Sequence, residues 1–121
     1  MSRGSAAVDF VLVSALLTLL FAGVLQLALS LHVRNTLVDA AGEGARYGAL
    51  VGRDEDDARA RAELLIASAL SDRLAQDVEA TTASLGGVQT VVVTVRAPLP
   101  VIGLIGPAGV MEVRGHAVLP S

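Results

Sequence analysis

An uncharged apolar segment near the N-terminus constrains this chain more than any other feature. It reads FVLVSALLTLLFAGVLQLALSL from Phe10 to Leu31 and contains 22 residues without a formal charge. As an α-helix with a rise of about 1.5 Å per residue, it would be roughly 33 Å long, which matches a bilayer hydrocarbon core of about 30 Å. We therefore predict a transmembrane helix over residues 10–31.

A cleaved secretory signal is the main alternative for this segment. The apolar part of such a signal has about 7 to 15 residues and ends in a small-x-small cleavage site. The segment here is longer, and the LHVRNTL that follows it is a poor cleavage context. A retained helix is therefore favoured, although Arg3 before it and Arg34 after it do not orient it by charge.

The helix is expected to continue beyond the membrane as a stalk, so that the N-terminal helix covers residues 5–50. Apolar and small residues recur there close to helical spacing: Val33, Leu37, Ala40, Ala41, Gly44, Ala45 and Gly48. The glycines each cost a helix about 1 kcal/mol relative to alanine. They would therefore weaken the helix unless another element packs closely against that face.

Residues 51–121 are predicted to form a small head. A second, amphipathic helix over about 54–75 begins at Asp54 as N-cap, with three further carboxylates in its first turn. The period then changes to 2, which indicates strands over about 78–84, 88–97 and 111–118. An apolar loop, APLPVIGLIGPAG, joins the last two. The expected fold class is α+β, with a long N-terminal helix and an antiparallel sheet of about three strands.

No stretch of the chain carries a convincing catalytic, cofactor or metal motif. GEGARYG at Gly42–Gly48 has the wrong spacing for a dinucleotide loop, and the acidic run Asp54–Asp57 lacks the alternate ligands and central glycine of a calcium loop. His32 and His116 are far apart in sequence, and the chain has no cysteine and no GxSxG. We predict no enzymatic activity, no cofactor and no small-molecule substrate.

Nucleic acid is also an improbable partner for this chain by its composition. The net charge is -3, and the aromatic residues are two phenylalanines and one tyrosine. Nucleic-acid surfaces need basic patches and stacking side chains.

A stripe of small or polar residues recurs every four positions along the predicted span: Ser14, Thr18, Ala22, Gln26 and Ser30. In lipid, such residues favour contact with other helices through close approach and hydrogen bonding. The stripe is therefore predicted to pack against partner helices. The alternative is that the hydroxyl groups bond to carbonyls of their own helix and that Gln26 extends toward the interface.

Asp9 is a carboxylate at the edge of the apolar segment. A charge inside a membrane helix costs about 2.5 to 3.5 kcal/mol at the bilayer centre and less at the edge, so Asp9 requires an interfacial position or a cationic partner. Cleavage after Gly4 would free the amine of Ser5, four residues before Asp9 and on the same helix face. Such a cut would supply a positive charge to this carboxylate or to that of a neighbouring subunit.

These residues resemble a type IV prepilin processing site, with Gly4 before the scissile bond, Ser5 after it and an acidic residue fifth in the mature chain. The pair Asp9–Phe10 is similar to the Glu-Tyr or Glu-Phe pair of Flp pilins, with Asp in place of Glu. RGSAAVDFVLV together with VRNTLVDAAGEGARYGAL resembles the TadE-like family, which are minor pilins or pseudopilins of the tight-adherence (Tad) pilus. The APLPVIG loop is similar to that family as well.

The resemblance implies a non-enzymatic subunit of the inner membrane with a cytoplasmic N-terminus and an extracytoplasmic head. It implies a leader of residues 1–4 that a prepilin peptidase removes, and assembly with other pilins and the Tad machinery into a cell-surface pilus. Asp9 would neutralise the N-terminal amine of an adjacent subunit. An unprocessed single-pass anchor that carries a scaffold or binding module is the alternative. A position in the shaft, at the tip or in priming assembly stays open, as does any adhesion ligand.

Overall fold

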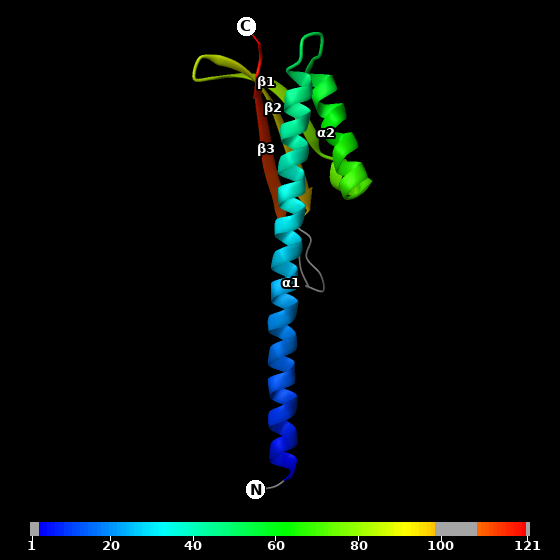
Figure 1. Ribbon diagram of the computed structural model, residues 1–121, viewed down its shortest axis with the longest axis vertical. Helices are drawn as coiled ribbons and strands as arrows, with labels where there is room; N and C mark the ends of the chain where they lie inside the picture. Colours follow the sequence, from blue (N-terminus) through cyan, green and yellow to red (C-terminus); the bar gives the residue numbers. More distant parts are fainter. Residues whose placement is uncertain (1–2, 99–108, 121) are drawn as a thin grey trace.

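One long helix, α1 (Arg3–Gly48), forms the axis of the molecule (Figure 1). The computed structural model describes residues 3–98 and 109–120. After α1 come α2 (Glu55–Ala69), a short 3-10 helix η1 (Asp72–Ala75), and the strands β1 (Val78–Leu85), β2 (Val88–Pro98) and β3 (Val110–Val118). The expected α+β class, with a long apolar N-terminal helix, a second helix and a three-stranded antiparallel sheet, is confirmed.

The three strands pair in the order β1-β2-β3, and both pairings are antiparallel. β1 and β2 form a hairpin whose tight turn contains Gly86 at φ 60 and Gly87 at φ 83. Two successive positive φ angles are typical of a type I′ turn, which suits the twist of a hairpin and favours glycine. The register runs from Val78 opposite Val95 to Leu85 opposite Val88.

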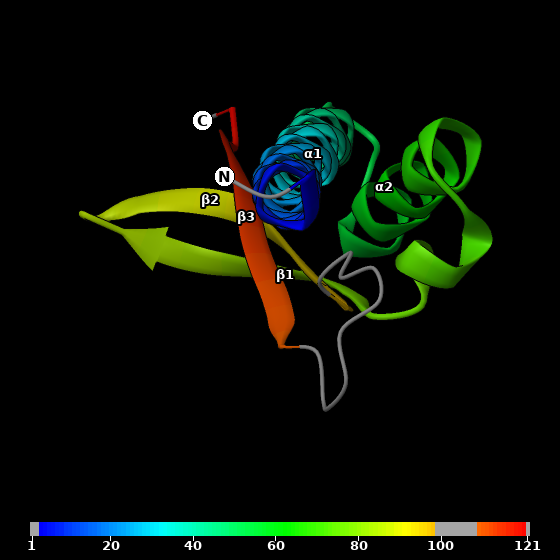
Figure 2. The ribbon, with the colours of Figure 1, turned by 90° about the horizontal axis from the view of Figure 1, so that it is seen from below.

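The core lies between the upper part of α1, α2 and one face of the sheet. Figure 2 shows both helices on the same side of the strands. The largest fully buried side chains are Leu37, Ile66, Val91, Val93 and Val95. Alternate residues of β2 point into this core because successive side chains of a strand face opposite sides. The continuation of α1 beyond the apolar segment therefore packs along the head, starting at Val33.

The second helix is shorter than the 54–75 predicted from its periodicity. α2 ends at Ala69, where Leu70 leaves the helical region at φ -123 and ψ -89. Ser71 is extended, and η1 begins after it. The chain needs this break because it must reverse direction to bring Val78 beside Val95. The strands agree with the expected ranges to within one residue, whereas most of the predicted apolar loop lies outside the described residues.

The outer face of the sheet is polar at one end. Arg96 on β2 lies 3.4 Å from Glu79, 3.6 Å from Asp77 and 3.9 Å from Glu112. Glu79 contributes most to raising the pKa of Arg96, and the other two carboxylates add to it. A group whose pKa is raised by folding stabilises the fold at every pH below its ordinary pKa. Because the ordinary pKa of arginine lies far above neutrality, Arg96 adds no pH dependence to the stability of the fold near neutral pH.

Candidate functional site

The lower part of α1, residues 3–28, extends away from the head (Figure 1), and none of its residues is buried. Its most apolar 18-residue window has a mean hydropathy of 2.4, and none of that window is buried by the rest of the described chain. Phe10 is 73% exposed and Leu19 is 71% exposed. Among the described residues, this is the one helix long and apolar enough to span a membrane. Such an exposed apolar surface is consistent with single-pass anchoring in a membrane.

The residues predicted for processing and pairing lie together at the free end of α1. Gly4 and Ser5 are exposed in its first turns, and Asp9 and Phe10 follow about one turn later. Asp9 forms no ion pair with any residue that the structure describes. The carboxylate is therefore accessible to a cation from another molecule or from a newly formed N-terminus.

Members of the small and polar stripe make two kinds of contact. The hydroxyl of Thr18 donates a hydrogen bond of 2.8 Å to the carbonyl oxygen of Ser14, so this threonine bonds to its own helix. Ala22 and Gln26 line a shallow apolar groove with Leu25 and Leu29. A four-residue repeat turns by about 40° at each step around an α-helix, because each residue turns by about 100°. The stripe thus winds around α1 and does not present all its members to one straight neighbour.

Gly44 and Gly48, also predicted to pack against a helix, contact α2 of the same chain. A Cβ atom at Gly44 would lie 2.8 Å from the carbonyl oxygen of Ala58 and from the Cβ of Ala62. A Cβ at Gly48 would overlap the Cβ of Ala58. Two glycines four residues apart on α1 thus face two alanines four residues apart on α2. This spacing lets the two helix backbones approach closely.

Gly115 on β3 is a packing residue that the sequence analysis missed. A Cβ atom there would overlap the backbone of α1 at Ala41 and Gly42. Within the predicted strand over 111–118, Gly115 stands between the buried Val113 and the half-buried Ala117. A lone glycine inside a strand pattern often marks the close approach of another backbone, and that signal could have identified it.

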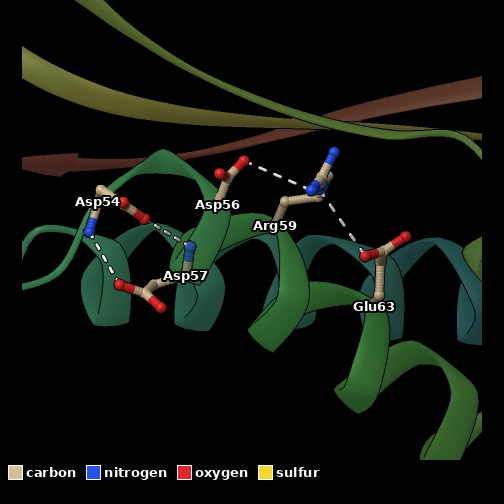
Figure 3. A network of polar contacts seen from close by, with 5 residues as sticks. All are labelled: Asp54, Asp56, Asp57, Arg59 and Glu63. Atoms are coloured by element: carbon tan, nitrogen blue, oxygen red, sulfur yellow. Dashed lines mark hydrogen bonds and ion pairs between the residues drawn. The ribbon is translucent and has the colours of Figure 1, made fainter.

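The acidic run forms the N-terminus of α2 (Figure 3). The backbone amide of Asp57 donates to the Asp54 side chain at 3.0 Å, and the amide of Asp54 donates to the Asp57 side chain at 3.0 Å. Asp56 lies 3.4 Å from Arg59, which also approaches Glu63 at 4.0 Å. These carboxylates have the structural role expected for a helix N-terminus, and Asp54 as N-cap is confirmed.

The two histidines do not meet. His32 is exposed on α1, whereas His116 is exposed on β3 opposite Val92. Residue 116 follows Gly115, which contacts Ala41 and Gly42, so it lies about three helical turns above His32. Within residues 3–98 and 109–120, no group of three or more His, Cys, Asp or Glu side chains is arranged to hold a metal ion.

Comparison with known proteins found one family. Residues 4–46 match the model of the family described as TadE-like protein. The match begins at Gly4, includes Asp9 and the whole exposed part of α1, and ends before Gly48. Searches of curated proteins and of solved structures returned no match.

Proposed function

Because the chain belongs to the TadE-like family through its residues 4–46, we propose that it is a non-enzymatic minor pilin or pseudopilin of a Tad pilus. Its N-terminal helix would anchor it in the inner membrane and pack with the helices of other pilins. The observation that carries the proposal is the exposed apolar part of α1, which has Gly4, Ser5 and Asp9 at its free end. The head would lie outside the cytoplasm.

The proposed processing step hydrolyses the peptide bond between Gly4 and Ser5. A prepilin peptidase would remove residues 1–4 and leave a charged amine on Ser5. Asp9 lies four residues further along α1, which is about 6 Å along the helix axis. An axial shift of about this size between two neighbouring subunits would bring the amine of one beside the Asp9 carboxylate of the other. Pairing would remove two isolated charges from the membrane edge, where an unpaired charge is unfavourable.

The stripe along α1 would contribute a second kind of contact. Ser14, Ala22 and Ser30 leave less bulk on the helix surface than the surrounding leucines, so neighbouring helices could approach closely at these points, whereas Gln26 could contribute through its amide. Because the stripe winds around α1, different members would meet different neighbours. This arrangement is compatible with a bundle of several pilin helices around each subunit.

Mass spectrometry of the chain from cells that contain the cognate prepilin peptidase tests the processing step. We expect the mature chain to begin at Ser5. Gly4→Val should leave the full-length chain, because a branched side chain would then precede the scissile bond. Gly23→Val is the matched control, because a Cβ atom there meets nothing within 4 Å, and its processing should be normal. An intact wild-type chain would contradict processing and favour the unprocessed anchor.

Co-purification with other pilins tests the role of Asp9. Asp9→Asn should be processed normally but should recover about tenfold less pilin, which corresponds to about 1.4 kcal/mol per contact. Asp9→Glu keeps the charge and should retain most of the recovery. Equal recovery with Asn and Asp would mean that Asp9 is merely interfacial.

A further inference from the structure

The height of the head along α1 can be derived from one close contact. Gly115 of β3 lies against the backbone of Ala41 and Gly42. β3 runs in the same direction as α1 (Figure 1), and Val110 precedes Gly115 by five residues. These residues span about 16 Å of strand at 3.3 Å each, which equals about 11 residues of helix at 1.5 Å each. Val110 therefore lies beside α1 at about the level of Ser30 or Leu31.

The hydrophobic core is consistent with this level. Met111, which follows Val110, belongs to the same buried cluster as Val33, and Leu29 packs against that cluster. Leu29 is inside the apolar segment 10–31 predicted to cross the membrane. The lower end of the sheet and the upper end of the span thus overlap in height, and no length of bare helix separates the head from the bilayer surface.

The lower rim of the head is defined here as Pro98 and Val110, which pair at the end of β2 and the start of β3. Val110 is 69% exposed and Pro98 is exposed. Leu31, at the same level on α1, is 50% exposed. Exposed apolar side chains on three elements, β2, β3 and α1, therefore lie at the level of the predicted membrane boundary.

The outer face of the sheet changes character immediately above this rim. Arg96 pairs with Glu112 two residues further from the rim in the strand register. These two residues form a charged group with Asp77 and Glu79. Two strand residues span about 6.6 Å. An apolar row with a charged row just above it matches the change from acyl chains to headgroups at a bilayer surface.

We propose that the lower rim is a second membrane contact, which inserts Pro98 and Val110 into the interfacial layer of the leaflet where α1 emerges. The inference rests on the proposed insertion of α1 in the bilayer. The occupant is lipid, because the rim is continuous in height with the span and the charged row stands above it. With two points of contact, the head has a defined orientation on the membrane before assembly.

Single-tryptophan fluorescence tests the proposal, because the chain contains no tryptophan. Full-length Val110→Trp is reconstituted at low protein-to-lipid ratio in phosphatidylcholine–phosphatidylglycerol vesicles with lipids brominated near the carbonyl end of the acyl chains. The matched control is Val118→Trp, on the same strand face and 63% exposed, but eight residues further from the rim. Leu17→Trp reports the span itself. We expect Val110→Trp to be quenched several-fold more strongly than Val118→Trp.

The rim contact would be overturned if the Val110→Trp and Val118→Trp variants showed equally weak quenching. The anchor would stand if Leu17→Trp were at the same time strongly quenched by lipids brominated deeper in their acyl chains. Absence of quenching for Leu17→Trp would overturn both the anchor and the rim contact.

Because tryptophan itself prefers membrane interfaces, Val110→Cys and Val118→Cys provide a second measurement in this cysteine-free chain. A water-soluble maleimide should modify Cys at 110 several-fold more slowly than at 118. Equal rates, or protection that grows with protein density in the vesicle, would overturn lipid as the occupant.

Discussion

At the residue scale, three glycines determine how closely the elements of the head approach one another. Gly44 and Gly48 give α2 access to the backbone of α1, and Gly115 does the same for β3. Glycine weakens a helix interior because it loses more conformational freedom on folding. The close packing against Ala58 and Ala62 offsets that loss at the first two positions, whereas a Cβ atom at Gly42 would meet only the Arg46 side chain, although the Gly42 backbone lies against Gly115.

Substitution of two glycines on the same helix separates packing from helix propensity. Gly44→Ala should lower the free energy of unfolding of the head by about 1–2 kcal/mol, because overpacking costs about 1–3 kcal/mol and exceeds the gain in propensity. Gly42→Ala should be neutral or stabilise by up to about 1 kcal/mol. Chemical denaturation followed by circular dichroism in detergent measures both. A Gly44→Ala protein as stable as Gly42→Ala would show that α2 shifts without cost.

At the element scale, α1 has two parts that differ in burial. Its lower part contains no buried residue, whereas its upper part supplies the buried residues from Val33 to Gly48. α2 is stabilised differently, by its capping box and by the buried alanines and Ile66 on one face. α1 therefore leaves an apolar surface exposed over its lower part, whereas α2 depends on local capping and tertiary contacts.

Removal of the α2 cap is expected to destabilise the head. Asp54→Ala leaves the amide of Asp57 without its side-chain acceptor and should cost about 1 kcal/mol. The control is Asp56→Ala, whose carboxylate is 84% exposed and makes only a long pair with Arg59, and which should cost less than about 0.5 kcal/mol. Denaturation midpoints of the two variants give the comparison. If the two variants lose equally little free energy of unfolding, the hydrogen bonds of the capping box stabilise the head no more than bonds to water would.

At the scale of the whole molecule, the head begins where the apolar span ends. The core includes Val33 and reaches Leu29 at its margin, so about the first half of α1 adds no buried contact to the head. Folding of the head and the proposed anchoring in the membrane would thus be separable properties of one continuous helix. This separation would let the helix exchange lipid for pilin neighbours without unfolding the head.

Two truncations test whether the head folds without the span. A chain that starts at Leu27 keeps the whole buried cluster and should unfold cooperatively in aqueous buffer. A chain that starts at Asp39 lacks Val33 and the fully buried Leu37. Loss of one such side chain costs about 2–5 kcal/mol, so the shorter chain should be largely unfolded. Near-ultraviolet absorbance and far-ultraviolet circular dichroism during urea titration measure this. Equal stability of the two truncated chains would show that the residues of α1 before Asp39 do not contribute to the core.

Much of this architecture could be predicted from the sequence because local patterns report it. The uncharged segment 10–31, the N-cap at Asp54 and the alternation in β2 each depend on residues close together in the chain. The end of α2 at Ala69 could not be predicted in this way, because no glycine or proline marks it and the reversal serves the pairing of β1 with β2. The importance of Gly115 depends likewise on a partner more than 70 residues away.

The sequence by itself determined which surfaces are apolar, where a helix or a strand forms, and the family motif at the free end of α1. Only the tertiary structure decided which apolar surfaces meet one another. It assigned Gly44 and Gly48 to a partner within the chain, left the lower part of α1 without buried residues among those that the structure describes, and set the lower end of the sheet at the level where the apolar segment ends. The physical reason is that periodicity reports which face of a helix or strand is buried. Which element covers that face, and at what position along it, depends on contacts between distant segments of the chain.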